Sequence, residues 1–162
     1  SVSRGLGDVY KRQAFDSGDL SAYRALKQEL LPYVTPCGVF TRRRSDCLKL
    51  PSGLVVVDVD HLDSPDEAGR LKQLLFKDPY LAPVLVFISP TGRGVKAFVP
   101  CPIGKDSTEA VRWAMNYVHC MYDAENTQPG KGVDTSGKDL VRACFLCHDP
   151  KALLRKVVNF EL

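Results

Sequence analysis

The sequence has no long apolar run, no strong excess of charge of one sign and no internal repeat. None of its apolar runs approaches the roughly 20 residues that a membrane-spanning helix requires, so we expect no membrane partner. It shows no basic start followed by an apolar stretch, so we predict no secretory signal and a cytoplasmic protein. A content of 44% hydrophobic and 25% charged residues excludes wholesale disorder.

The small net charge of +3 says little about partners, because much of it lies in the first thirteen residues. Segment 1–13 has three basic residues against one acidic residue and no hydrophobic periodicity, and it resembles a translated adapter sequence. We therefore treat 1–13 as a non-structural leader and 14–162 as a single domain. Any binding of nucleic acid must then come from local basic patches.

The six cysteines are expected to be reduced thiols, because the chain has no export signal. Cys144, Cys147 and His148 match the spacing of covalent haem attachment, but they lie in an apolar predicted strand, so we expect no haem. A zinc site stays open, with Cys37 and Cys47 as candidate partners. A regular strand would place Cys144 and Cys147 on opposite faces, which argues against it.

The hydrophobic pattern predicts an α+β fold. A capped amphipathic helix starts after Asp19 and ends at Pro32, and two short strands, 39–41 and 47–50, flank an arginine-rich tip. The order from Leu54 onward is β-α-β-β-α-β, which is the ferredoxin-like or RRM-like unit with spatial strand order 4-1-3-2. The N-terminal helix and small hairpin are expected to pack on that core. The predicted core elements are strands at 54–60, 83–89, 95–99 and 140–147, helices at 64–77 and 107–124, and a closing helix at 151–160.

This topology brings acidic residues together at one end of the sheet. Asp58 and Asp60, two apart on the first strand, project to the same face, and Asp134 and Arg142 approach from the start of the fourth strand. Adjacent carboxylates repel each other, and burial makes the repulsion worse. A divalent cation removes that cost, and carboxylate oxygens suit Mg²⁺ or Mn²⁺. We therefore predict metal ligation, with Mg²⁺ or Mn²⁺ as cofactor, by Asp58, Asp60 and Asp134.

A glycine-bearing turn precedes the third strand and can offer backbone N–H groups, a hydroxyl and cations to phosphates. The predicted phosphate-binding residues are Ser89, Thr91, Gly92, Arg93, Gly94, Lys96 and Arg142. Each feature also has a simpler interpretation. An Asp-x-Asp pair is often a cap, a Gly-x-Gly turn is often only a hairpin, and Arg142 can be a structural ion-pair partner. The arginines at the hairpin tip (Arg42, Arg43 and Arg44) are either a solvated loop or a contact for a template strand.

In this order, Asp58-Val59-Asp60, the segment from Thr91 to Lys96, Asp134, and Arg142-Ala143-Cys144-Phe145 resemble the motifs of archaeo-eukaryotic primases. More narrowly, they resemble the primase-polymerase-related domain, once labelled VirE N-terminal, of mobile-element and phage proteins. The resemblance covers roughly residues 23–150. It implies that the three aspartates hold two metals. The family's glycine motif normally ends in a phosphate-contacting histidine, and Lys96 stands at that place.

The resemblance implies template-directed nucleotidyl transfer by a primase or polymerase, with nucleoside triphosphates and single-stranded or primed DNA as partners. Asp58, Asp60 and Asp134 would then be the catalytic residues. The alternative is a catalytically inactive nucleic-acid-binding module of the same fold that partners a replicative helicase. The lysine at the histidine position favours the alternative, and the complete set of three aspartates favours the enzyme.

Overall fold

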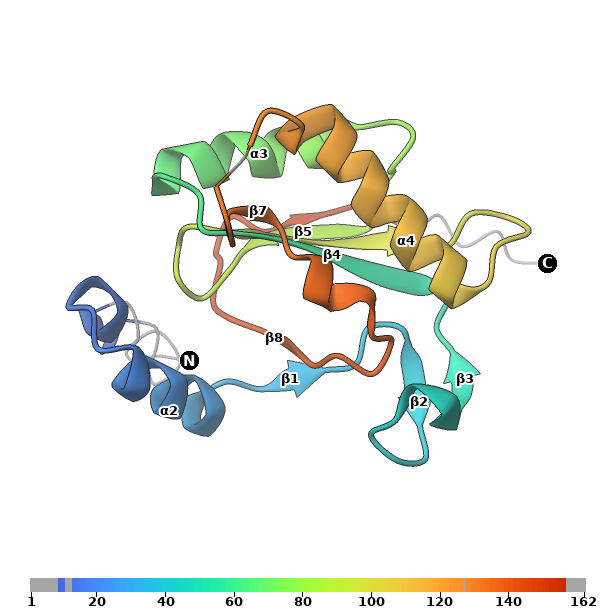
Figure 1. Ribbon diagram of the computed structural model, residues 1–162, viewed down its shortest axis with the longest axis horizontal. Helices are drawn as coiled ribbons and strands as arrows, with labels where there is room; N and C mark the ends of the chain where they lie inside the picture. The colour runs from blue at the N-terminus through green and yellow to red at the C-terminus, as the bar shows by residue number, and fades with distance from the viewer. Residues whose placement is uncertain (1–8, 11–12, 127, 157–162) are drawn as a thin grey trace.

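The computed structural model describes residues 9–10, 13–126 and 128–156, and its centre is an antiparallel sheet of five strands (Figure 1). Their order across the sheet is β7 (Gly132–Val133), β4 (Leu54–Asp60), β6 (Val95–Pro100), β5 (Leu85–Ile88) and β9 (Leu153–Leu154). The long strands are rich in β-branched residues, which suit buried positions in a sheet.

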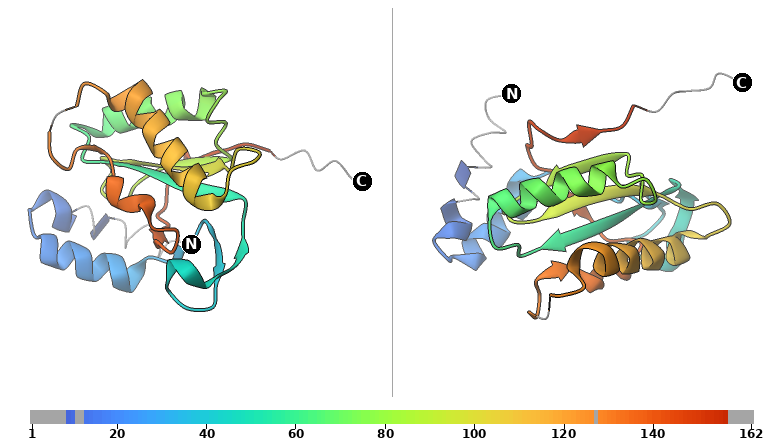
Figure 2. Two further views of the ribbon diagram at one scale, coloured as in Figure 1. Left: turned by 45° about the vertical axis from the view of Figure 1, so that its right-hand side comes forward. Right: turned by 90° about the horizontal axis from the view of Figure 1, so that it is seen from above.

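Two amphipathic helices, α3 (Pro65–Lys77) and α4 (Ser107–Val118), cover one face of this sheet (Figure 2). Ser64 caps α3 by accepting a hydrogen bond from the Glu67 backbone N–H, and Asp106 caps α4 in the same way. A short π-helical turn, His119–Asp123, continues α4. The apolar faces of the helices bury every second residue of β4 (Val55, Val57 and Val59) in the main core.

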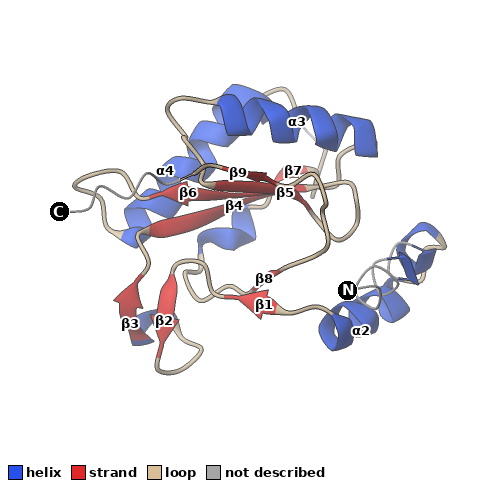
Figure 3. Cartoon of the chain, turned by 180° about the vertical axis from the view of Figure 1, so that it is seen from behind, coloured by secondary structure: helices blue, strands red, loops and turns tan. Residues whose placement is uncertain are grey.

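The opposite face of the sheet is covered by segments from both ends of the described chain (Figure 3). They are α2 (Leu20–Leu30) and the ribbon formed by β1 (Tyr33–Val34) and β8 (Cys144–Phe145). The hairpin of β2 (Gly38–Phe40) and β3 (Leu48–Pro51) lies toward the end at which β4 begins, and its Phe40 and Leu48 pack against the main core. Val56 and Phe87 of the sheet form a second, smaller core with Cys144. The carboxylates predicted as ligands lie on this face, since Asp58 and Asp60 alternate with the core-facing valines.

The α+β class is confirmed, as is the order β4-α3-β5-β6-α4-β7, in which strands β7-β4-β6-β5 reproduce the predicted order 4-1-3-2. The identity of the fourth strand was predicted wrongly. Its place beside β4 is taken by Gly132–Val133, whereas segment 140–147 contains only β8, which pairs with β1. Leu140 and Val141 are buried, so the apolar character of the segment reflects packing instead of pairing in the central sheet.

The closing helix predicted at 151–160 is also wrong over the residues described. Leu153–Leu154 form the edge strand β9, and the Arg155 backbone N–H continues the pairing to the Val84 carbonyl at 2.8 Å. Residues 157–162 lie outside the described part. Of the predicted leader, the structure describes only Val9, Tyr10 and Gln13. None of the helices in the described ranges is long and apolar enough to cross a membrane.

Candidate metal centre

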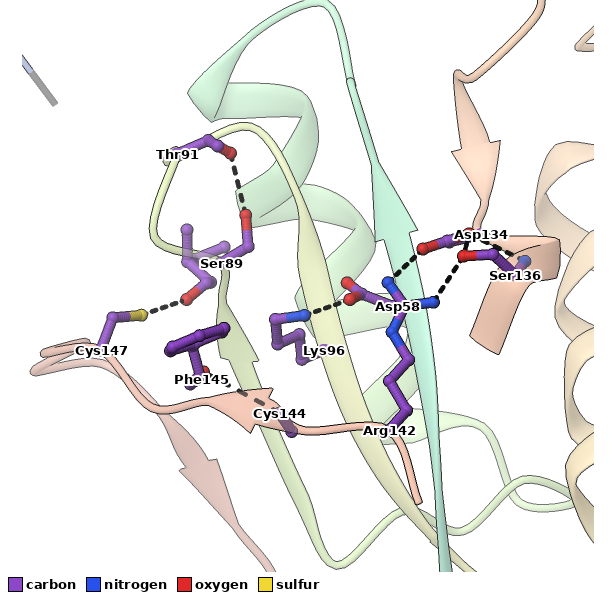
Figure 4. Close-up of polar contacts among 11 residues, drawn as sticks. Asp58, Ser89, Thr91, Lys96, Asp134, Ser136, Arg142, Cys144, Phe145 and Cys147 are labelled. Carbon is purple, nitrogen blue, oxygen red and sulfur yellow. Dashed lines mark hydrogen bonds and ion pairs between the residues drawn. The ribbon is translucent and has the colours of Figure 1, made fainter. Parts of the chain in front are cut away.

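The three predicted carboxylates converge at the end of β4, and Figure 4 shows two of them, Asp58 and Asp134. Val59 pairs with Val133 of β7, and the next residue, Asp134, donates its backbone N–H to the Asp58 carbonyl at 2.8 Å. Asp58, Asp60 and Asp134 each offer an oxygen atom, and these three atoms lie within 4.8 Å of one another. The predicted convergence is therefore present. That the three residues bind a metal stays a prediction.

Two cations of the chain neutralise part of this charge. The Lys96 ammonium forms an ion pair with Asp58 Oδ2, and the Arg142 guanidinium forms one with Asp134 Oδ2. Figure 4 shows the two cations reaching the carboxylates from different segments. Burial alone would lower the pKa of Lys96, but the charge of Asp58 and the hydrogen bond to it outweigh burial and raise that pKa. Two of the three cations predicted to bind phosphate, Lys96 and Arg142, are thus at the centre, where they contact carboxylates.

The inner oxygen of Asp58, Oδ1, is buried and has no hydrogen-bond partner in the described part of the chain. A buried acceptor without a partner is unfavourable, and a cation is one remedy. The Asp60 carboxylate likewise makes no ion pair or hydrogen bond with a described residue. Burial raises the pKa of Asp60, and the negative charges of Asp58 and Asp134 raise it further, against the opposing effect of Lys96. These oxygens are hard ligands that fit Mg²⁺ or Mn²⁺.

Asp134 is held in its ionised form. Burial would raise the pKa of Asp134, but hydrogen bonds from Arg142 and Ser136 outweigh burial and hold the pKa below its ordinary value. Asp134 Oδ1 accepts from the Ser136 backbone N–H at 2.9 Å and from Ser136 Oγ at 2.6 Å. Arg142 Nη1 donates to the same hydroxyl at 2.8 Å. Arg142 therefore orients Asp134.

The residues of the predicted phosphate-binding turn lie at two different places in the structure. A Cβ on Gly94 would lie 2.7 Å from Ser89 Oγ and 2.8 Å from Asp60 Oδ1, so Ser89 and Gly94 adjoin the centre. Thr91, Gly92 and Arg93 instead border a separate cavity of about 610 Å³ beside the start of α3.

The turn also satisfies much of its own hydrogen bonding. The Gly92 backbone N–H donates to the Ser89 carbonyl at 2.9 Å, and the Arg93 backbone N–H donates to Thr91 Oγ1 at 3.1 Å. Arg93 Nη1 donates to the Asp63 carbonyl at 3.2 Å. In this conformation the Gly92 and Arg93 N–H groups and the Arg93 guanidinium donate hydrogen bonds within the protein. Their contact with phosphate stays a prediction.

The open side of the centre is a cavity of about 430 Å³. Asp60 and Asp134 line it together with His61, His119 and Lys131. His61 has a φ of 57°, in the left-handed region that a residue other than glycine rarely adopts. The cavity gives a ligand of small-molecule size a route to the two carboxylates.

The arginine-rich tip lies apart from the centre. The β2–β3 hairpin projects below the sheet, toward the end at which β4 begins, whereas Asp58 and Asp60 lie where β4 ends (Figure 1). Arg42, Arg43 and Arg44 are exposed, and Arg44 Nη2 pairs with Asp46 Oδ2 at 2.6 Å. Contact of this tip with a template strand stays a prediction.

Two residues of α2 that were not predicted as site residues face the centre. Lys27 Nζ lies 4.7 Å from the centroid of the Phe145 ring, and burial, followed by the positive charge of Lys96, lowers the pKa of Lys27. Tyr23 is buried, and burial and Asp60 raise its pKa to about 12. Their spacing of four residues places them on one helical face, but nothing in that spacing connects the face to the carboxylates.

The cysteines considered for zinc lie in different surroundings. Cys37 packs in the core under the helices, Cys144 packs in the smaller core, and Cys147 Sγ donates to the Ile88 carbonyl at 2.9 Å. Burial raises the pKa of the Cys144 thiol to about 11. In the described ranges, the aspartate triad is the cluster of ligand-type side chains close enough to share a metal.

A family model described as "BT4734-like, N-terminal domain" matches residues 25–154, which make up most of the chain and include all three aspartates. No curated protein and no solved structure shows detectable similarity to the chain.

Proposed function

The chain belongs to the family of BT4734-like N-terminal domains, and from the carboxylate centre of this member we propose metal-dependent nucleotidyl transfer on a DNA template in the cytoplasm. The observation that carries the proposal is the convergence of Asp58, Asp60 and Asp134, whose carboxylates each bring an oxygen within 4.8 Å of the others, while the buried Asp58 Oδ1 has no partner among the described residues. The resemblance to primase-polymerases supports the same assignment.

The residues of the centre fit Mg²⁺ or Mn²⁺, with Asp58, Asp60 and Asp134 as the ligands. A divalent cation at this place supplies Lewis-acid chemistry, which favours ionisation of a primer 3′-hydroxyl and neutralises charge on a triphosphate. In the reaction, the 3′-oxygen forms a bond to the α-phosphorus, the α–β phosphoanhydride bond breaks, and pyrophosphate leaves.

The chain's own residues position this chemistry. Arg142 keeps Asp134 ionised and oriented through a guanidinium contact and the shared Ser136 hydroxyl. Gly94 lets the turn before β6 lie against Asp60. The cavity of about 430 Å³ admits the nucleotide to the open side of Asp60 and Asp134, where Lys131 adds a positive charge.

The test is primer extension. The protein is incubated with Mn²⁺, primed single-stranded DNA and labelled nucleoside triphosphates, and we expect template-dependent product. Asp58→Asn and Asp60→Asn should each lower the rate by roughly a thousandfold, because each removes a metal ligand. Asp66→Asn is the matched control, since Asp66 lies on the exposed side of α3, away from the three carboxylates. Product that both ligand variants leave unchanged would overturn the proposal.

A second candidate, a catalytically inactive DNA-binding module that partners a helicase, is favoured by one observation. Lys96 and Arg142 already neutralise two of the three carboxylates, as they would in a purely structural ion network. This candidate predicts DNA binding that survives Asp58→Asn and Asp60→Asn, with no incorporation under any divalent metal.

A further inference from the structure

The Lys96 ammonium lies where a cation bound to Asp58 would lie. Lys96 is directly opposite Asp58 in the β4–β6 register, and both residues are only 9% exposed. The two belong to central strands of the sheet, so backbone pairing fixes the distance between their Cα atoms. The ion pair is therefore part of the framework, unlike a contact between long surface side chains.

Some carboxylate oxygens of the centre have a hydrogen-bond or ion-pair partner in the chain, and we call these used. The oxygens without such a partner we call free. Asp58 Oδ2 is used by Lys96, Asp134 Oδ2 by Arg142, and Asp134 Oδ1 by Ser136. Asp58 Oδ1 and both oxygens of Asp60 have no partner among the described residues. The free oxygens of Asp58 and Asp60 suffice for one cation, and Asp134 can add a third ligand by sharing an oxygen that already accepts a hydrogen bond.

Space differs between the two sides of the centre: Asp58 lines the small cavity, Asp60 lines the open one and Asp134 lines both. On the side of Lys96, the cavity between Asp58, Asp134, Arg142 and Cys144 has a volume of only about 10 Å³, no more than a single water molecule requires. On the other side, Asp60 and Asp134 open into about 430 Å³. Mg²⁺ and similar ions keep several waters, so only the open side accommodates a hydrated ion.

The formal charge of the centre also favours one resident divalent cation over two. Three carboxylates with Lys96 and Arg142 leave a single formal negative charge at the centre. One divalent cation turns this into one positive charge, which suits an approaching polyphosphate. Two divalent cations would leave three positive charges close together before any substrate binds, an arrangement that mutual repulsion opposes.

We propose that Lys96 fills one of the two cation positions of the centre, so that the domain holds one resident divalent cation and a second arrives only together with a nucleoside triphosphate. This inference rests on the proposed metal-dependent function, and it gives Lys96 a role different from a direct contact with phosphate. Lys96 is then a positioning residue, which acts through Asp58.

The test counts Mn²⁺ bound per chain in the absence of nucleotide, by electron paramagnetic resonance of free Mn²⁺ or by calorimetry. We expect one site in the wild type. Lys96→Ala removes the ammonium and its stem and should admit a second Mn²⁺. Lys96→Arg is the matched control that keeps the positive charge, and it should retain one site. Circular dichroism establishes that each variant is folded.

Two Mn²⁺ in the wild type, none in the wild type, or one in a folded Lys96→Ala variant would each overturn the inference. If Lys96→Ala does not fold, the wild-type count decides alone. The outcome is independent of the extension assay. The expected counts without any incorporation would remove the proposed function and leave the Lys96 assignment standing. Nucleotide incorporation by a wild type that holds two resident Mn²⁺ would support the proposed function and overturn the Lys96 assignment.

Discussion

Among single residues, Asp60 is the carboxylate of the centre that the chain compensates least. The folded state raises its pKa through burial and the neighbouring carboxylates. The folded state therefore binds a proton more tightly than the unfolded state does. Asp60 has its ordinary pKa in the unfolded state and a raised pKa in the folded state. As pH rises from the first value to the second, the free energy of unfolding of the metal-free protein falls. Above the raised pKa this loss of stability is complete.

We accordingly expect Asp60→Asn to raise the melting temperature of the metal-free protein at pH 7 by a few degrees, while it abolishes Mn²⁺ binding. The gain should disappear below the ordinary carboxyl pKa, where Asp60 is protonated in both states. Calorimetric unfolding in EDTA across a pH series measures this, with the exposed Asp66→Asn as control. A lower melting temperature for Asp60→Asn at pH 7 would show that its charge is compensated.

Gly94 lies where the structure has no room for a side chain. A Cβ at this position would lie 2.7 Å from Ser89 Oγ and from the Val59 carbonyl oxygen, and 2.8 Å from Asp60 Oδ1. We expect Gly94→Ala to displace Asp60 and to weaken Mn²⁺ binding at least tenfold. Gly69→Ala is the control, because no heavy atom lies within 4 Å of its added Cβ and alanine favours the helix. Calorimetric Mn²⁺ titration of both variants measures the difference, and equal affinities would refute this account of Gly94.

The sequence predicted the ligand-type residues better than it predicted their partners. Asp58 and Asp60 were predicted because neighbouring carboxylates on an apolar strand need compensation, and Asp134 because the expected topology and the resemblance bring it to them. The pairing of Lys96 with Asp58 depends on the register between β4 and β6, which neither sequence segment specifies alone. Lys27 was missed for a related reason, since only the path of α2 below the sheet brings it near the centre.

At the scale of elements, helices and long strands were predicted well and short pairings were not. The caps at Ser64 and Asp106 and the valine-rich β4 carry strong local signals. By contrast, β7 has two residues, one of them Gly132 with a φ of 93°. A strand of two residues shows no alternation of apolar and polar positions. The fourth strand was therefore predicted in the longer apolar segment 140–147.

The C-terminal part of the described chain is fixed to α3 by a buried ion pair. Lys72 Nζ lies 3.0 Å from Asp149 Oδ2 and donates to the Lys151 carbonyl at 2.7 Å. Asp149 Oδ2 also accepts from the Ile88 backbone N–H at 2.9 Å. This cluster holds the chain beside β5, where β9 then pairs with that strand.

Lys72→Met should lower the free energy of unfolding by about 3–5 kcal/mol, because it leaves the buried Asp149 carboxylate without its counter-ion. Lys77→Met on the exposed side of the same helix should change it by less than about 1 kcal/mol. Urea unfolding followed by circular dichroism measures both. A loss below about 1 kcal/mol for Lys72→Met would show that solvent reaches the pair.

For the molecule as a whole, the sheet separates two kinds of chemistry. The face under α3 and α4 is an apolar core of valine, leucine and alanine. The opposite face carries the carboxylates and cations, and it is covered by α2 and the β1–β8 ribbon. The period-2 alternation of β4 predicted that its valines and carboxylates lie on opposite faces. No local pattern indicated which segments cover the polar face, since those contacts join residues far apart in the chain.

The distribution of the ligands along the chain has a consequence for biosynthesis. A ribosome releases Asp58, Asp60 and Lys96 well before Asp134 and Arg142, and the apolar core needs little beyond residue 118. A nascent chain can thus bury its valines while its triad is still incomplete. Any capacity to capture a metal would therefore be acquired only after residue 134 has been made, later than the scaffold that supports it.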